Sequence, residues 1–155
     1  MKITIPALNN QTTDIIIIGG GLAGLVSAIH LSKAGLTVTL IEKNEYPKHK
    51  VCGEYISNEV LPYLQHLGAD PLTTGAKKIN RFLLSTTRGK TIETTLPLGG
   101  FGVSRYTLDH FLLQKAVANN CTVIQDTVSD VHFANDIFKV TTKDGNELNA
   151  KMVIG

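Results

Sequence analysis

The glycine-rich stretch between two apolar segments near the N-terminus restricts the fold of this chain more than any other feature. Residues Asp14 to Ile18 form a short, β-branched run that is typical of a parallel strand buried on both faces. The run leads into Gly19, Gly21 and Gly24, and the apolar residues from Leu22 to Ala34 then recur with helical spacing. Glycines with this spacing, between a strand and a helix, indicate a backbone that something must approach closely.

A second strand completes the local unit. Gly35 is placed to end the helix, and Leu36 to Glu42 is again largely apolar and rich in β-branched residues. Strand, helix and strand within about thirty residues form one βαβ unit, which predicts an α/β fold. The chain has 155 residues, a length that suits one domain, and its net charge of +2 gives no electrostatic case for binding nucleic acid.

The G-x-G-x-x-G spacing has a physical explanation in nucleotide-binding folds. Gly19 permits the tight turn, Gly21 lets the backbone approach a pyrophosphate, and Gly24 lets the helix pack against the strand. The phosphates of such a ligand sit on free N–H groups at the start of the helix, where the helix dipole is positive. Leu22 and Ala23 would supply such donors.

Glu42 ends the second strand, close to the distance of about 20 residues at which dinucleotide-binding folds place an acid. Its carboxylate can accept hydrogen bonds from both hydroxyls of an adenosine ribose. The negative charge would repel a 2′-phosphate, which disfavours NADP at this site. The glycines and this acid predict a dinucleotide ligand but do not distinguish NAD from FAD.

After Glu42 the chain does not continue with another βαβ unit. We expect, in order, a polar connection over 44–54, a short helix after Ser57 that ends near Gly68, a hairpin of Ile79–Thr86 and Lys90–Leu96, a loop over 97–102, and a helix from Leu108 to about Asn119 capped by Thr107. A short strand and a three-stranded meander follow, over Thr122–Gln125, Val128–Phe133, Ile137–Thr142 and Glu147–Ile154.

This layout resembles the flavoproteins built like glutathione reductase and p-hydroxybenzoate hydroxylase, in which a three-stranded meander replaces a crossover helix. The resemblance implies an α/β, Rossmann-like FAD-binding fold with a parallel sheet, a β-meander and an inserted hairpin. It also implies that the glycines and Glu42 bind the ADP half of FAD. A nicotinamide dehydrogenase would usually continue with another βαβ repeat instead.

Two further segments narrow the resemblance. Residues 48–57, "KHKVCGEYIS", are similar to a K-x-C-G segment of the geranylgeranyl reductase family, whose relatives include electron-transfer flavoprotein dehydrogenases, halogenases and monooxygenases. Residues 103–116, "VSRYTLDHFLLQKA", are similar to an R-x-x-L/F-D-x-x-L segment of the same proteins. The resemblance implies further contacts with FAD: Lys43 over the adenosine, Lys50 and Cys52 near the flavin, Arg105 at pyrophosphate or ribityl oxygens, and the backbone of Val128 at the adenine edge.

The resemblance also sets an expectation for domain organisation. We expect residues 1–12 to be a flexible leader and residues 13–155 to be the N-terminal portion of an FAD-binding domain. In the family that the chain resembles, the last strand continues into a substrate-binding domain and a final segment that holds the ribityl chain. We expect both parts to be absent from this chain, and we therefore expect no catalytic residue within it.

The function implied is that of an enzyme, an FAD-dependent oxidoreductase of the geranylgeranyl reductase-like group. Its implied partners are a small-molecule or lipid-like substrate and an electron-transfer partner. Three alternatives stay open. They are an FAD-dependent monooxygenase or halogenase with NAD(P)H as external reductant, an NAD-binding dehydrogenase domain, and a non-catalytic module that keeps the fold, as Rab GDP-dissociation inhibitors do.

Cysteines and histidines give no sign of a disulfide framework or a metal site. Cys52 and Cys121 lie far apart, and the five histidines share no spacing typical of metal ligands. Such cysteine usage favours a reducing, cytoplasmic location. The glycines interrupt the longest apolar stretch, so we expect no transmembrane segment.

Overall fold

The structure is a computed structural model that describes residues 12–155, so the expected leader, apart from residue 12, lies outside the described residues. The helices and strands follow in this order: β1 (Thr13–Ile18), α1 (Leu22–Lys33), β2 (Val38–Glu42), β3 (Tyr55–Ser57), α2 (Leu61–His66), β4 (Lys77–Ser85), β5 (Thr91–Gly102), α3 (Arg105–Ala118), β6 (Thr122–Gln125), β7 (Val128–Ala134), β8 (Ile137–Thr142) and β9 (Glu147–Ile154). Short 3₁₀ turns at Asn58–Val60 and Pro71–Thr74 flank α2.

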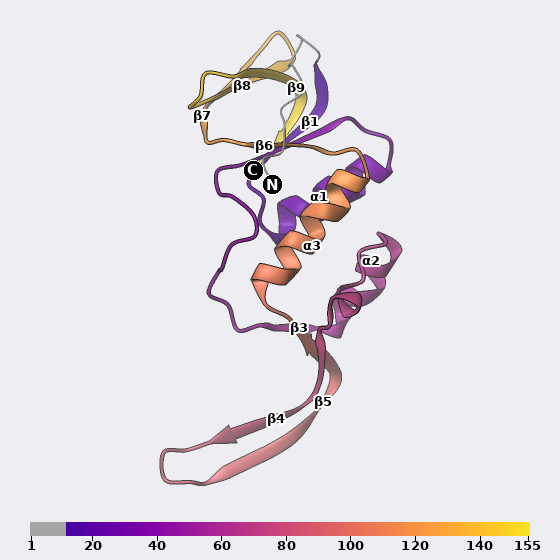
Figure 1. Ribbon diagram of the computed structural model, residues 1–155, viewed down its shortest axis with the longest axis vertical. Coiled ribbons are helices and arrows are strands. Elements are labelled where there is room, and N and C mark those ends of the chain that lie inside the picture. The colour runs from indigo at the N-terminus through magenta and orange to yellow at the C-terminus, as the bar shows by residue number, and fades with distance from the viewer. Residues whose placement is uncertain (1–11) are drawn as a thin grey trace.

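The larger of the two sheets has six strands in the order β6-β2-β1-β9-β8-β7. Strands β6, β2, β1 and β9 run parallel, and β9, β8 and β7 form the antiparallel meander. Figure 1 shows the meander at the end of the molecule opposite the hairpin of β4 and β5. The predicted α/β fold with a parallel sheet, a meander and an inserted hairpin is confirmed.

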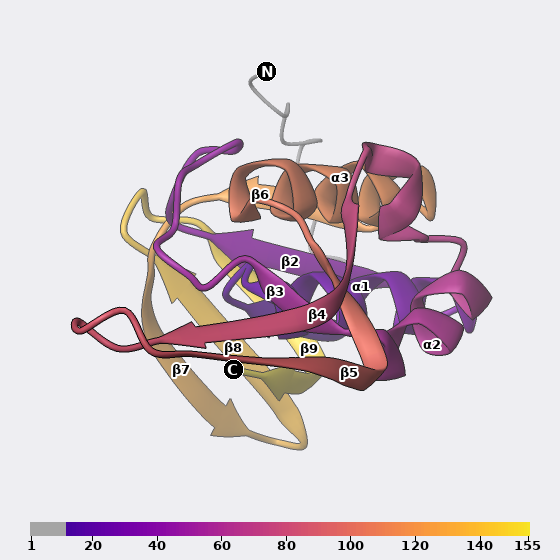
Figure 2. The ribbon, with the colours of Figure 1, turned by 90° about the horizontal axis from the view of Figure 1, so that it is seen from below.

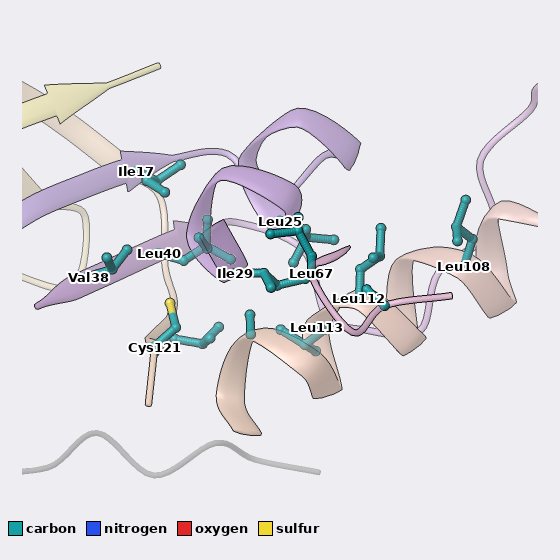
Figure 3. Close-up of a cluster of buried hydrophobic side chains, with 14 of the residues drawn as sticks. Ile17, Leu25, Ile29, Val38, Leu40, Leu67, Leu108, Leu112, Leu113 and Cys121 are labelled. Carbon is teal, nitrogen blue, oxygen red and sulfur yellow. The ribbon is translucent and has the colours of Figure 1, made fainter. Parts of the chain in front are cut away.

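Helices α1 and α3 cover one face of the parallel strands because alternate strand residues point toward them. Side chains of β1 and β2, such as Ile17 and Leu40, contact Leu25 and Ile29 of α1 and the apolar side of α3. Figure 3 shows this cluster, in which Leu112 and Leu113 face the same core. Each fully buried aliphatic side chain contributes about 1.5–3 kcal/mol.

The opposite face of the sheet has its own core. It contains Ile16, Ile41 and Ile124 from the parallel strands together with Val140 and Leu148 from the meander. Strands β1 and β2 are therefore buried on both faces, which explains why their sequences are almost continuously apolar. This double burial fixes the carboxyl ends of the two strands, where the glycine turn and Glu42 lie.

A second sheet, in the order β3-β5-β4, departs from two sequence-based expectations. The predicted loop over 97–102 is wrong, because β5 continues to Gly102 and its end pairs with both β3 and β4. The strand β3 itself was not expected. At Gly100 an added Cβ would overlap the Tyr55 ring, so its glycine permits this close pairing.

Helix α3 begins three residues earlier than the sequence predicts. Ser104, rather than Thr107, is its N-cap, and the Ser104 Oγ accepts the Thr107 N–H at 3.2 Å. Arg105 therefore stands in the first turn of the helix instead of in the loop before it. Among residues 12–155 no helix has the length and apolar character needed to cross a bilayer.

Candidate functional site

The turn between β1 and α1 has the backbone geometry that its glycine spacing predicts. Gly19 has a positive φ of 106°, which favours glycine, and its N–H donates to the carbonyl of Ile41 at 2.8 Å. An added Cβ at Gly24 would overlap the carbonyl oxygen of Gly19. The first glycine thus serves the turn, and the third permits the helix to lie directly against it.

The N-terminus of α1 carries no side-chain cap. Gly21 is its N-cap residue, and an added Cβ there would meet no atom within 4 Å. The first helical hydrogen bond runs from the Leu25 N–H to the Gly21 carbonyl at 2.9 Å. The N–H groups of Leu22 and Ala23 form no hydrogen bond within residues 12–155. They are donors in the positive field of the helix dipole.

Glu42 lies beside this turn and is buried, with 7% of its surface exposed. Its Oε2 accepts the N–H of Gly20 at 2.7 Å, and its Oε1 accepts the N–H of Asn44 at 2.8 Å and the ammonium of Lys48 at 3.1 Å. Burial alone would raise the pKa of Glu42, but hydrogen bonds from Asn44, Gly20 and Lys48 together lower it below its ordinary value. The side chain is therefore a carboxylate near neutral pH.

Tyr46 approaches the same turn from the loop after β2. Its hydroxyl donates to the carbonyl of Gly20, and an added Cβ at Gly20 would overlap that hydroxyl. Burial raises the pKa of Tyr46, so the hydroxyl keeps its proton. Sequence reasoning did not identify Gly20 or Tyr46. Gly20 occupies a variable position of the G-x-G-x-x-G motif, and a glycine there is the one sequence feature that could have indicated this close contact.

Arg105 and Asp109 form a bidentate pair one helical turn apart on α3. The Arg105 Nε and Nη2 donate to the two Asp109 oxygens at 2.6 and 2.8 Å, and Asp109 is fully buried. The hydrogen bond to Asp109 raises the pKa of Arg105, which burial opposes. The ring of His49 stacks on that of Tyr106 with 4.6 Å between centroids, so the loop that leads to Cys52 approaches the first turn of α3.

The remaining predicted site residues lie around this centre. Lys43, Lys50 and Cys52 are exposed, whereas Val128 is partly buried at the start of β7. The N–H of Asp126, two residues before Val128, donates to the Glu42 carbonyl at 3.1 Å. The structure thus brings the glycine turn, Glu42, Tyr46 and the start of β7 together. Arg105 pairs with Asp109 and forms no hydrogen bond with the turn within residues 12–155, and Lys43, Lys50 and Cys52 lie at the surface.

An open, apolar pocket of about 430 Å³ adjoins Glu42. It lies between the loop after β2, the outer side of α3 and strand β6, the edge strand of the parallel sheet. Figure 2 shows α3 above β2, and β6 overlaps the helix in this view. Leu113, Val117 and Ile124 supply apolar walls, and Tyr46 reaches one side.

The second cysteine belongs to the core. Cys121 is buried beyond the C-terminal end of α3 (Figure 3), and burial raises the pKa of its thiol to about 11. Such a thiol is inert at neutral pH. Within residues 12–155 no three His, Cys, Asp or Glu side chains form a group that could hold a metal ion.

Comparisons with known proteins agree with this geometry. The family model described as FAD dependent oxidoreductase matches residues 14–53, which contain the glycine turn, Glu42 and Tyr46. The menaquinone reductase of Mycolicibacterium smegmatis is 30% identical over 59 residues, covering 38% of this chain and 14% of that protein. The 3-demethoxyubiquinol 3-hydroxylase of Escherichia coli is 27% identical over 165 residues, covering 96% of this chain and 42% of that protein.

Halogenases are similar as well. A flavin-dependent halogenase of Armillaria mellea is 29% identical over 137 residues, covering 81% of this chain and 26% of that protein. The crystal structure of CmlS, a flavin-dependent halogenase, superposes with a TM-score of 0.78 at 24% identity, covering 94% of this chain and 29% of that one. The chain spans less than half the length of each of these proteins. These matches are to FAD-dependent oxidoreductases, the class that the sequence predicts, and the superposition shows the Rossmann-like FAD-binding fold.

Proposed function

We propose that the turn between β1 and α1 binds the diphosphate of FAD. The observation that carries this proposal is the open N-terminus of α1. Gly21 places no side chain there, a Cβ would meet no atom within 4 Å, and the N–H groups of Leu22 and Ala23 are unused within residues 12–155. An anion at this position gains both the hydrogen bonds and the helix dipole.

Glu42 is proposed to hold the adenosine ribose. Its Oε2 accepts one hydrogen bond, from Gly20, so its second lone pair remains for a ribose hydroxyl. The adenine would then lie toward the mouth of the apolar pocket, with Lys43 on one side and the backbone of Val128 on the other. The hydrogen bond between Asp126 and Glu42 supports this arrangement, because it fixes the start of β7 beside the ribose acid.

Arg105, Lys50 and Cys52 are proposed to lie on the flavin side of the diphosphate. Asp109 occupies two N–H groups of Arg105, which leaves three for pyrophosphate or ribityl oxygens. Asp109 thereby orients the guanidinium before any ligand arrives. The bound FAD would supply hydride or electron transfer, and the residues of this chain would position it.

The reaction that we propose is reduction or dehydrogenation of a small-molecule or lipid-like substrate, as in the geranylgeranyl reductase-like group, with an electron-transfer partner. The segment that carries Cys52 and the similarity to a menaquinone reductase support it. We also propose that residues 13–155 are one part of a longer protein whose other parts complete the substrate site. The coverage of the relatives supports this view.

A second candidate is an FAD-dependent monooxygenase or halogenase that uses NAD(P)H as external reductant. The similarity to a hydroxylase over 96% of this chain favours it about as strongly. Oxygen uptake with NADH or NADPH, measured on the full-length protein with quinols or quinones as trial substrates, separates the two candidates. A monooxygenase consumes oxygen in step with product, whereas a reductase turns over under nitrogen.

Gly21→Val tests the diphosphate site. Without a ligand, the Cβ of a valine at residue 21 would meet no atom within 4 Å, and the φ of −72° at Gly21 suits any residue. We therefore expect the variant to fold. The side chain would occupy the space of the diphosphate, and we expect the purified full-length variant to lose its flavin absorbance. A variant that retains stoichiometric FAD would contradict the proposal.

A further inference from the structure

Tyr46 has a role in the site that no glycine motif describes. We propose that Tyr46 is a positioning residue for the dinucleotide turn, whose hydroxyl fixes the direction of the peptide group between Gly20 and Gly21. The inference rests on the proposed function, since it assumes that this turn binds the diphosphate. It adds a specific requirement: the turn must be held by a side chain from the loop after β2.

Three consecutive glycines make the turn intrinsically loose. Gly19, Gly20 and Gly21 lack Cβ atoms, so rotation of the peptide groups between them meets little steric resistance. A turn that presents N–H groups to a diphosphate therefore needs constraints from outside itself. The N–H of Gly19 is held by the Ile41 carbonyl, and two further contacts from outside the turn hold Gly20.

The two constraints hold opposite sides of Gly20. Its N–H donates to Glu42 Oε2 at 2.7 Å, and its carbonyl accepts from the Tyr46 hydroxyl. In a trans peptide the C=O and the following N–H point in opposite directions. A carbonyl of Gly20 that is held toward Tyr46 therefore directs the N–H of Gly21 away from Tyr46.

Tyr46 is itself well fixed. Its ring packs against the core that α1 and α3 share, with the ammonium of Lys48 at 5.8 Å from the ring centroid. The hydroxyl fills the place that a Cβ at Gly20 would take, and that Cβ would also lie 3.0 Å from the Cβ of Glu42. Residue 20 and residue 46 thus form a matched pair: the tyrosine hydroxyl requires the glycine, and the glycine carbonyl receives the hydroxyl.

Tyr46→Phe in the full-length protein tests the positioning role. If the hydroxyl favours the binding geometry of the turn by about 1 kcal/mol, its removal should weaken FAD binding about fivefold. The ³¹P resonances of the bound FAD should shift, because the donors around its diphosphate change direction. The matched control is Tyr55→Phe, since the Tyr55 hydroxyl also donates to a glycine carbonyl, that of Gly99 at 3.1 Å, but in the second sheet.

A purely structural role for Tyr46 predicts a different result. Both tyrosine variants would then lower the melting temperature while FAD affinity and ³¹P resonances stay those of the wild type, and that outcome would overturn the inference. If the wild-type protein itself binds no FAD, the proposed function fails, which distinguishes the two failures.

A pair of substitutions at residue 20 keeps the inference testable even if Tyr46→Phe unfolds the protein. Gly20→Ala alone should weaken FAD binding by more than about tenfold, because the new methyl collides with the Tyr46 hydroxyl. In the double variant Gly20→Ala with Tyr46→Phe the hydroxyl is gone, and we expect affinity to recover at least threefold relative to Gly20→Ala. If the losses of binding free energy in the two single variants add up to the loss in the double variant, the two residues act independently.

Discussion

Gly20, Gly21 and Gly24 lie within five residues of one another, yet each is glycine for a different reason. Gly20 leaves room for the Tyr46 hydroxyl, Gly21 leaves open space in front of the helix, and Gly24 leaves room for the carbonyl of Gly19. Substitutions at the three positions should therefore fail in different ways. A loss of ligand without a loss of stability is expected only at Gly21.

Gly24→Ala should destabilise the fold itself. The new Cβ would overlap a backbone oxygen, which cannot move aside as a flexible side chain can. Strain of this kind costs about 1–3 kcal/mol, and the helix propensity of alanine offsets roughly 1 kcal/mol. We expect a net loss of up to about 2 kcal/mol in a thermal or urea unfolding experiment on the protein without flavin. A melting temperature equal to that of the wild type would show that α1 moves without cost.

Glu42→Gln is a sharper probe of the ribose acid than Glu42→Ala. Alanine would leave the N–H of Gly20 buried and unpaired, and would remove the partner of Lys48, so the protein would lose stability together with affinity. Glutamine keeps the shape and, with its oxygen toward the turn, the Gly20 contact, but its NH₂ group replaces the oxygen that accepts from Asn44 and Lys48. We expect FAD affinity to fall about tenfold, measured by quenching of flavin fluorescence, with a smaller drop in melting temperature than Glu42→Ala causes. An unchanged dissociation constant would remove Glu42 from the ribose role.

The motif predicted the glycine turn and Glu42 but not Tyr46, for a physical reason. Turn glycines and the acid occupy fixed offsets from a strand and a helix, so their spacing is visible in sequence. The hydrogen bond between Tyr46 and Gly20 instead depends on how the loop after β2 folds back, which no spacing encodes. The pairing of Arg105 with Asp109 stayed unseen because the start of α3 was placed at Leu108.

Helices and strands were predictable where the burial pattern was regular. β1, α1, β2 and the meander follow from runs of apolar residues with a constant period and from turns such as Asn135-Asp136, both of which have positive φ. The end of β5 was missed because Gly99, Gly100 and Gly102 are typical of loops. Only the contact with β3, whose Tyr55 ring lies on Gly100, gives these glycines a place in a strand.

Asp14 ties the start of β1 to two neighbouring strands, and this connection should make stability depend on pH. Its carboxylate accepts from the Thr37 N–H at 2.9 Å, which precedes β2, and from the Lys151 ammonium of β9 at 2.7 Å. The hydrogen bonds from Lys151 and Thr37 lower the pKa of Asp14 well below its ordinary value of 3.8. A lowered pKa contributes stability above that ordinary value, and this contribution is lost as the pH falls below it.

Asp14→Asn should therefore make the free energy of unfolding depend less on pH in the acid range. We expect the variant to be less stable than the wild type at neutral pH and the difference to shrink as the pH falls below about 3.8. Urea midpoints at several pH values measure both effects. Asp130→Asn is the control, because the Asp130 side chain forms no hydrogen bond within residues 12–155. Parallel curves for wild type and Asp14→Asn would exclude the connection as a source of the pH dependence.

Taken together, the molecule has a compact nucleotide-binding body and a hairpin that projects from it. Figure 1 shows β4 and β5 extending away from the helices, with the glycine turn and the sheet in the body. Cross-strand pairing places Phe82 opposite Thr94 and Leu84 opposite Ile92 on one face of the hairpin. The other face carries the ion pair of Arg81 and Glu93. The hairpin is thus amphipathic, and its apolar face is exposed.

This exposed face should govern the solution behaviour of the 155-residue chain. Phe82, Leu84 and Ile92 are 48%, 55% and 68% exposed, and contiguous apolar surface on a two-stranded ribbon with free edges favours association. We expect the isolated chain to self-associate as its concentration rises, and Phe82→Thr with Ile92→Thr to shift it toward monomer in sedimentation velocity. The control Leu83→Thr removes a side chain that is equally exposed but lies on the charged face, so it should leave association unchanged. If Leu83→Thr shifted the chain toward monomer as far as the double variant does, exposed apolar surface in general would drive association. The face formed by Phe82, Leu84 and Ile92 would then have no special role.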